Sequence, residues 1–512
     1  MQATPHRCTA LPPGYAPRKP QQTLLHQTLS AHWPAFKRRA EAHGGLPDFV
    51  VGEVEDYLQC GLFEHGCVVA RCGGCGHELV VGLSCKRRGF CPSCCGRRMA
   101  DTAAHLVDAV LPRVPIRQWV CSFPWQLRYA MGYDRRLCAE LMSAFASELS
   151  RSYRRRAKRA LGLSSVSDAL TGAVTFVQRF DSALRLGPHA HTLVLDGVYV
   201  RAQDGGLEFH ALPEPTVAEV TSVAASTAAR IERVLAAHGR ELDERTDSGD
   251  DQLSLDYPAL ASCYRAATAG QQLLGERPGQ PALRLVGQPP RQRARSQATL
   301  VAEVRGVNVH AQRVVDGRDR RQLERLCRYL ARPPLSHDRL AQLPDGRLSL
   351  SLKTHWSDGT KAIVLSPMDL IARLCALVPP PRMHMTRFFG VLSSASKHRP
   401  QVVPTPEPDP ELQTPVQLSL LQPDGTAPAP PPPTDPPPRS GRHPWAWLLR
   451  RVFKVDVTVC PRCQGHMRIQ EVALSAAAVD RVLARQGLCA QPPPSPPQPL
   501  PGQLGLPGVP IH

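Results

Sequence analysis

Long apolar runs and aromatic side chains are scarce in this sequence of 512 residues. Phe, Trp and Tyr make up 5% of it, and no stretch approaches the roughly 20 consecutive apolar residues that a membrane-spanning helix needs. Residues 1–20 are rich in proline and hold no apolar core of a secretory signal peptide. We therefore expect a soluble, cytoplasmic protein with no membrane partner. Its length and its 42% hydrophobic content predict more than one domain and at least one sizeable core.

Lysine is also scarce, with eight residues, so arginine supplies the other 54 of the 62 cations. Against 44 acidic residues this gives a formal net charge of +18. Such a field attracts polyanions, and nucleic acid is the commonest polyanion in a cytoplasm. The same arginine excess accompanies GC-rich coding, so the charge alone leaves both interpretations open.

Proline, in contrast, is plentiful, and two segments with runs of it are poor in large apolar residues. Such segments do not pack, so we predict a disordered linker over 401–440 and a disordered tail over 490–512. Between them, 441–475 is predicted to be a small module around Cys460-Pro-Arg-Cys463. This pair with His466 is only half of a metal site, and Cys489 lies far off in the sequence, so metal binding here is the less favoured interpretation.

Periodicity upstream of the linker mixes helices with strands. Apolar spacing of three and four residues predicts helices over 99–111, 135–161, 217–242, 319–331 and 368–377. Extended apolar runs predict strands over 117–122, 173–180, 191–200, 304–315 and 347–353. The mixed order favours an α+β fold over a strict βαβ repeat. Here we expect two domains, over 20–125 and 126–400.

Eight of the seventeen cysteines crowd into residues 60–95. In a chain of this length without a signal peptide, such crowding indicates metal binding rather than disulfides. Two pairs with two-residue gaps are typical of one tetrahedral zinc site. These pairs are Cys72 with Cys75, and Cys91 with Cys94.

Further thiols in this segment exceed what one zinc ion needs. In one interpretation Cys60 and Cys85 bind a second zinc ion together with a neighbour, and in the other they are small buried thiols. Cations beside the cysteines favour a DNA-contacting zinc module over a catalytic zinc. These cations are Lys86, Arg87 and Arg88.

The helix predicted over 135–161 ends in a basic run. Cations are favoured at any helix C-terminus by the dipole, so an ordinary solvated helix end is one interpretation. A surface that contacts phosphates is the other, and it would use Arg154, Arg155, Arg156, Lys158 and Arg159.

Two histidines stand two residues apart in Gly187-Pro-His189-Ala-His191-Thr-Leu-Val-Leu. On a strand they project to the same side, about 6.6–7 Å apart. Two imidazoles so placed can chelate a divalent cation that acts on a phosphoryl oxygen. A chance His-x-His pattern on a strand is the alternative.

A tyrosine with two arginines on one helix face follows later, in Arg325-Leu-Cys-Arg-Tyr329-Leu-Ala-Arg332. A phenol is a poor nucleophile unless cations stabilise its phenolate, and Arg325 and Arg332 are placed to do so. The same arginines could hold a phosphate. Read alone, the segment is more typical of a half-buried tyrosine with snorkelling arginines.

Together these motifs resemble the transposases of insertion-sequence family ninety-one and its common-region relatives, which are bacterial rolling-circle enzymes of the HUH (His-hydrophobic-His) single-strand nuclease superfamily. The resemblance covers residues 45–400 and rests on ordered blocks: Ser84–Cys94, Pro188–Tyr199, Leu323–Pro334, Leu352–Thr360 and Leu377–Leu392. It implies an N-terminal Cys-rich zinc-binding module, followed by an HUH-type nuclease domain with an antiparallel central sheet and flanking helices.

The resemblance also implies a chemistry. His189 and His191 would bind Mg²⁺ or Mn²⁺, and Tyr329 would attack a DNA phosphate to give a 5′-phosphotyrosine and a free 3′-OH. A third metal ligand is usual in the superfamily, and we expect His310, with His355 as the alternative.

The partners implied are DNA molecules: single-stranded or hairpin transposon ends and the target DNA, with the protein nucleoid-associated when bound. The zinc module would recognise the end of the element, and the basic helix would follow the backbone. The sequence predicts no oligomeric state.

Two positions depart from the family pattern. Some members carry two tyrosines four residues apart, whereas positions 325 and 333 are Arg325 and Pro333 here. The chain therefore resembles the single-tyrosine kind. The residue between the histidines is Ala190, a small hydrophobe.

Two other functions fit the same residues. One is a non-catalytic zinc-dependent DNA-binding protein, either a regulator or a degenerate transposase. The other is a plasmid replication initiator with the same nicking chemistry.

Overall fold

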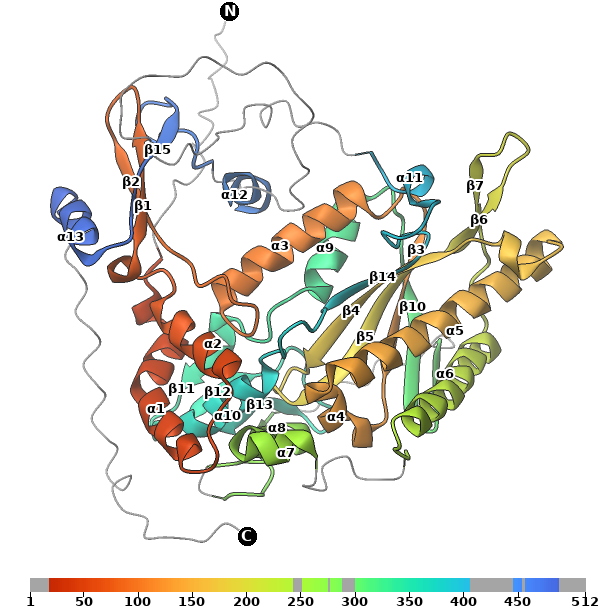
Figure 1. Cartoon of the computed structure of the whole chain (residues 1–512), viewed down its shortest axis with the longest axis horizontal. Helices are drawn as coiled ribbons and strands as arrows, with labels where there is room; N and C mark the ends of the chain where they lie inside the picture. The colour runs from red at the N-terminus through yellow and green to blue at the C-terminus, as the bar shows by residue number, and fades with distance from the viewer. Residues whose placement is uncertain are drawn as a thin grey trace, which may run out of the picture.

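The computed structural model describes residues 18–242, 251–274, 277–287, 300–405, 445–453 and 456–487. At its centre lies a six-stranded antiparallel sheet (Figure 1). In spatial order its strands are β14 (Thr386–Gly390), β4 (Gly172–Phe180), β5 (Leu186–Leu195), β3 (Ile116–Ser122), β10 (Val307–Val315) and β9 (Val301–Val304). The predicted α+β fold with an antiparallel central sheet and flanking helices is confirmed.

Helices cover both faces of this sheet, which is why β4 is buried along its whole length. The covering helices are α5 (Arg135–Leu161) and α6 (Val217–Ala237) on one face, and α3 (Pro92–Ala109) and α9 (Arg320–Leu330) on the other (Figure 1). Side chains alternate along β5, so Ala190 and Val194 pack with α5, whereas Leu193 and Leu195 pack with α3 and α9.

The long helix α5 matches its predicted bounds because both of its ends carry strong local signals. The Asp134 side chain accepts hydrogen bonds from the backbone N–H groups of Arg136 and Leu137. At the other end, Gly162 takes a left-handed conformation with φ of 64°, which favours glycine.

A second core lies beneath the N-terminal helices and includes Leu29, Val54 and Leu374. It is enclosed by four helices, α1 (Leu24–Glu41), α2 (Asp48–Gln59), α8 (Pro258–Ala269) and α10 (Pro367–Leu377). A four-stranded sheet completes it, in the order β11 (Leu340–Gln342), β12 (Leu348–Ser351), β13 (Thr360–Leu365) and β8 (Leu283–Val286).

A small three-stranded antiparallel sheet joins the two ends of the described chain. Its order is β15 (Met467–Ala473), β1 (Cys67–Cys72) and β2 (Glu78–Gly82), and α13 (Ala476–Arg485) packs against it. Because β15 falls in the module predicted over 441–475, that module shares a sheet with the N-terminal region.

The remaining elements connect these parts. They are α4 (Arg128–Tyr133), β6 (Gly197–Arg201), β7 (Leu207–Ala211), α7 (Gln252–Asp256), α11 (Arg399–Val402) and α12 (Trp445–Phe453). The predicted linker lies outside the described residues from position 406 onward, as does the whole predicted tail over 490–512. None of the described helices has the length and apolar character to cross a membrane.

Two predicted strands differ from the structure. The strand predicted over 304–315 begins later, as β10 (Val307–Val315), because Arg305 and Gly306, with φ of 49° and 75°, form the turn that joins it to β9. The run over 191–200 is divided at Asp196, so the histidine pair lies in the middle of β5 instead of at the start of a strand.

Candidate functional site

Two histidines face the same side of β5. The ring centroids of His189 and His191 are 5.0 Å apart, and their planes are inclined at 65°. Nδ1 of His189 lies 2.8 Å from the carbonyl oxygen of Gly187. A ring nitrogen that donates to a carbonyl fixes the tautomer, so the lone pair of Nε2 stays free. This is the arrangement of a metal-ligating imidazole.

His191 is buried, and Nε2 of the Gln118 side chain donates to its Nδ1 at 3.1 Å. Because an amide nitrogen only donates, Nδ1 of His191 is the acceptor in this contact, and Nε2 of the neutral ring carries the proton. Burial first, and then His189 and Arg332, lower the pKa of His191 to about 3. Burial also lowers the pKa of His189. Both rings are therefore neutral near pH 7, as ligands must be.

Helix α9 holds Tyr329 beside this face of the sheet. Leu326, Cys327 and Leu330 are buried against strands β4 and β5, while Tyr329 is 46% exposed. Asp319 caps the helix by accepting from the backbone N–H of Gln322. The nucleophile candidate is thus exposed on a rigid element.

Arg332 connects the tyrosine with the histidine pair. Its guanidinium carbon lies 4.3 Å from the ring centroid of Tyr329, and its NH2 donates to Oε1 of Gln178 at 3.1 Å. Gln178 on β4 pairs with His189 on β5 in the sheet register. Arg332 therefore contacts both the Tyr329 ring and Gln178, the residue opposite His189 in the sheet.

Two residues of this site carried no role in the sequence prediction. Gln178 is buried, and its Nε2 has no hydrogen-bond partner among the described residues. Lys353 lies with Nζ 5.6 Å from the Tyr329 ring, and desolvation, then Arg332 and Arg339, lower its pKa to about 8. Lys353 stands in one of the blocks that carry the resemblance, whereas Gln178 gave no signal beyond its place in a buried strand.

His310, the predicted third ligand, is not gathered with the pair. It lies on β10 opposite Val120 of β3, and Val120 in turn pairs with His191. The His310 side chain is exposed, and no described His, Cys, Asp or Glu joins the pair in a group with all ligand atoms within 4.8 Å of one another. One whole strand therefore separates His310 from His191. His355 is exposed in the loop between β12 and β13.

A cavity of about 330 Å³ opens beside Gln178 and Arg332. Its walls come from α3, the end of β4, the end of α9 and the loop before β14, and they include Arg88, Arg98 and His384. Arg88 donates to the carbonyl oxygens of Met383 at 2.9 Å and Pro380 at 2.8 Å, which anchors the Cys-rich segment to this loop. Cations from distant parts of the chain thus line one hollow.

The cysteines form two groups of four, and the grouping corrects the prediction from spacing. The first group is Cys60, Cys85, Cys91 and Cys94. Its sulfurs lie as close as 3.4 Å, between Cys85 and Cys94, and 3.7 Å, between Cys60 and Cys94. A tetrahedron of sulfurs at about 2.3 Å from one zinc ion has edges of about 3.8 Å. The donor set therefore fits zinc, which the structure does not include.

The electrostatics of this group also suit a bound cation. The pKa of Cys60 is lowered because Cys85, Cys91 and Cys94 donate hydrogen bonds to its sulfur. Cys91 precedes the first turn of α3, and a helix N-terminus favours negative charge.

The second group is Cys72, Cys75, Cys460 and Cys463. Cys72 and Cys75 therefore do not share a site with Cys91 and Cys94, as their spacing had suggested. The physical reason is that β1 and β2 extend away from α3, so Cys72 and Cys75 lie at the far end of a hairpin. The C-terminal pair, which alone was half of a site, meets them there.

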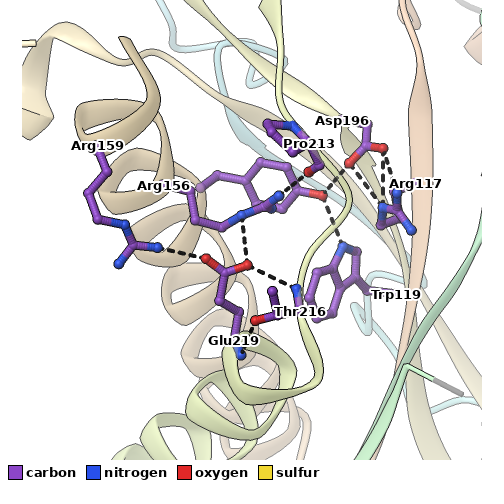
Figure 2. A network of polar contacts seen from close by, with 9 residues as sticks. Arg117, Trp119, Arg156, Arg159, Asp196, Pro213, Thr216 and Glu219 are labelled. Carbon is purple, nitrogen blue, oxygen red and sulfur yellow. Dashed lines mark hydrogen bonds and ion pairs between the residues drawn. The ribbon is translucent and has the colours of Figure 1, made fainter. Parts of the chain in front are cut away.

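The basic end of α5 is engaged in a network of polar contacts (Figure 2). Arg156 is buried, contacts Glu219 at 3.2 Å and donates to the carbonyl oxygen of Pro213. Arg159 pairs with the same carboxylate at 2.6 Å. Close by, Arg117 and Asp196 form a buried ion pair at 3.0 Å. Arg156 and Arg159 hold α5 to the start of α6, and the Arg117–Asp196 pair joins β3 to the end of β5.

The predicted DNA-contacting cations therefore fall into different surroundings. Arg156 and Arg159 are paired, and the α5 face of the sheet is opposite the face of the histidine pair. Arg155 and Lys158 are exposed on α5, and Arg154 is half-buried.

Near the first cysteine group, Lys86 is exposed and Arg87 pairs with Asp56 at 2.6 Å. Arg325 is exposed on α9, one turn before Tyr329.

Comparisons with known proteins agree with this assembly. A family of putative transposases matches residues 172–399, and a transposase zinc-binding domain matches residues 28–123. The transposase for insertion sequence element IS801 from Pseudomonas savastanoi pv. phaseolicola is 25% identical over 426 residues, which cover 80% of this chain and 86% of that protein. No solved structure matches the chain.

A central antiparallel sheet with a histidine pair, joined to a cysteine-rich N-terminal segment that matches a zinc-binding domain, defines the chain as a transposase. It belongs to insertion-sequence family ninety-one and carries the N-terminal zinc-binding domain of that family.

Proposed function

We propose that this transposase nicks and transfers single-stranded DNA through a covalent link to Tyr329. The observation that carries the proposal is the position of Arg332, which lies against the Tyr329 ring and bonds Gln178 opposite His189. A nucleophile, a cation for the phosphate and a pair of neutral imidazoles therefore meet on one face of the sheet.

His189 would hold the divalent metal ion through its free Nε2. His191 would join it through Nε2 once the Gln118 amide turns its oxygen toward Nδ1–H, which moves the ring proton off Nε2. Bound there, Mg²⁺ or Mn²⁺ supplies Lewis-acid polarisation of a phosphate oxygen and orients the leaving group. The buried Nε2 of Gln178, which lacks an acceptor in the described chain, would donate to a phosphate oxygen or to a water molecule at this place.

The chemical step follows from these positions. Oη of Tyr329 attacks the phosphorus, the bond from phosphorus to the 3′-oxygen breaks, and the proton of the phenol ends on that oxygen. The products are a 5′-phosphotyrosine and a free 3′-OH, and no nucleotide cofactor is consumed because one phosphoester replaces another. Arg332 and Lys353 lower the cost of the negative charge that develops on the phenol and the phosphate.

The DNA would approach along the cavity beside the site. Arg88, Arg98 and Arg332 line it, and their charges suit a phosphate backbone. A zinc ion on Cys60, Cys85, Cys91 and Cys94 would fix the start of α3 and with it the position of Arg98. The zinc-binding domain would thereby form one wall of the DNA path.

The test is a single-stranded oligonucleotide of the element's end, incubated with Mn²⁺ and analysed on a denaturing gel. We expect a covalent protein–DNA adduct in the wild type and none in Tyr329→Phe. The matched control is Tyr257→Phe, at the start of α8, which should form the adduct as the wild type does. DNA binding without an adduct on either end of the element would instead establish a non-catalytic DNA-binding protein.

A further inference from the structure

The second cysteine group is built from two ends of the chain. Sγ of Cys72 lies 3.4 Å from Sγ of Cys463, and Sγ of Cys75 lies 3.6 Å from Sγ of Cys460. The partners in these pairs are 391 and 385 positions apart in sequence. All four sulfurs lie within 4.8 Å of one another. These distances exceed the roughly 2.05 Å of a disulfide and approach the edges of a zinc–sulfur tetrahedron.

The backbone around the two pairs is matched, as in two facing turns around one ion. The N–H of Gly74 points at Sγ of Cys72, and the N–H of Arg462 points at Sγ of Cys460, each at 3.4 Å. Such N–H···S contacts stabilise thiolates, which are the form that binds a metal. A Cβ added to Gly465 would stand 3.1 Å from Sγ of Cys72, a tighter contact than most Cβ atoms make, so a side chain here would press on the sulfur.

The strands that carry the two pairs also belong together. β15 pairs with β1 from Cys67 opposite Ala473 to Cys72 opposite Met467. Helix α13 then packs Val482 on the apolar side of this sheet. Without β15 the N-terminal part would be a two-stranded hairpin, and such a hairpin has marginal stability in water.

A separate contact fixes α12, which precedes the second pair in the chain. Arg451 donates to Glu324 of α9 at 2.8 Å and to Asp108 of α3 at 3.1 Å. Glu324 lies on the helix that carries Tyr329. The C-terminal segment thus contacts both the cysteine-rich region and the tyrosine helix.

We propose that Cys72, Cys75, Cys460 and Cys463 bind a second zinc ion, which fastens the C-terminal segment onto the N-terminal hairpin. The zinc-binding region is then discontinuous in sequence: its second ion depends on residues outside the matched 28–123 domain. Four thiolates crowded within 4.8 Å repel one another, and the charge of the ion removes this cost. Metal binding is thereby coupled to closure of the chain.

Metal analysis of the full chain tests the stoichiometry. We expect two zinc ions per wild-type chain and one in the double variant Cys460→Ser, Cys463→Ser. The matched control His466→Gln changes an exposed side chain next to the same turn and should keep both ions. One ion in the wild type, or two in the double variant, overturns the proposal.

Cleavage of the protein backbone tests whether the second zinc ion joins the two ends of the chain. This experiment uses the wild-type cysteines, so it does not depend on how well the double variant folds. A recognition sequence for a specific protease is inserted in the full chain between positions 420 and 430, and the chain is cut after purification. We expect the two fragments to elute together from a sizing column when zinc is present and to separate after chelation. Separation with zinc still bound would show that the ion does not join them. Neither experiment involves DNA, so both outcomes are independent of the proposed nicking reaction.

Discussion

The two ends of the central sheet use arginine in opposite ways. At the α5 end, Arg117, Arg156 and Arg159 each pair with a carboxylate. At the histidine end, Arg332 donates to an amide oxygen and a backbone carbonyl, and Arg88 donates to backbone carbonyls. An arginine paired with a carboxylate holds two elements together, and the pair has little net charge. An arginine that donates to a neutral oxygen keeps its positive charge, which can attract a phosphate. The partners of each cation therefore indicate better than the net charge of +18 which cations can bind DNA.

The largest expected effect concerns the α5 end of the sheet, where the arginines are paired with carboxylates. In Asp196→Asn, the buried Arg117 loses its main counter-charge, and breaking a buried pair costs about 3–5 kcal/mol of unfolding free energy. Urea unfolding followed by circular dichroism measures this loss. Asp204→Asn, in the turn between β6 and β7, is the control and should change stability by less than about 0.5 kcal/mol. A loss below about 1 kcal/mol at Asp196 would show that this end is not held by charge pairing.

The reverse pattern is expected at the histidine end. Arg332→Gln should lower the rate of adduct formation by about 10²–10³-fold, the usual effect of removing one group that stabilises transition-state charge. Stability should change little, because within the described part of the chain the hydrogen bonds of Arg332 go to two neutral oxygens, Oε1 of Gln178 and the carbonyl oxygen of Tyr329. Gel kinetics with saturating DNA measure the rate. Arg318→Gln, exposed before α9, is the control, and equal losses in both variants would remove Arg332 from the site.

The neutral histidines should make the stability depend on pH. The pKa of His191 is about 3 when folded, below its ordinary value of about 6.5, so the unfolded chain binds more protons between these values. The stabilising contribution is complete above pH 6.5 and falls with the pH, by at most about 1.4 kcal/mol per pH unit. His191→Gln should therefore lose less stability than the wild type between pH 6.5 and 4.5. Parallel curves would mean that the ring is protonated in the folded protein.

How far the sequence predicts this molecule depends on the range of each signal. Local signals were sufficient for α5 and α9, since caps and apolar spacing act within a few residues, and they placed His189 and His191 on one strand face. The partners of Cys72 and Cys91 were not predictable, because a two-residue gap fixes each pair but not which pairs meet. That choice is made by β1, β2 and β15, which carry one pair away from α3.

Gln178 shows the same limit at the site. Its side chain matters because β4 lies beside β5 in the register that places it opposite His189, and this register is a tertiary feature. His310 does not join the pair for the corresponding reason. It lies on a strand of the same sheet, but β3 separates its strand, β10, from β5, which carries the histidine pair. Patterns along the chain identify candidate residues, and the order of strands decides which of them meet.

The smallest expected effect tests whether DNA contacts both ends of the sheet. Arg155 and Lys158 are the exposed part of the basic run on α5, and we expect the double variant Arg155→Ala, Lys158→Ala to bind single-stranded DNA within twofold of the wild type. Each lost phosphate contact reduces the slope of log affinity against log salt by about 0.7 for a single strand. Arg98→Ala, at the cavity, should show this reduction, whereas the α5 double variant should keep the wild-type slope. Fluorescence anisotropy titrations at several salt concentrations give the slopes. If the slope of the double variant fell by about 1.4, both side chains would contact phosphates. The DNA path would then extend across the α5 end, beside the charge pairs of Arg156 and Arg159.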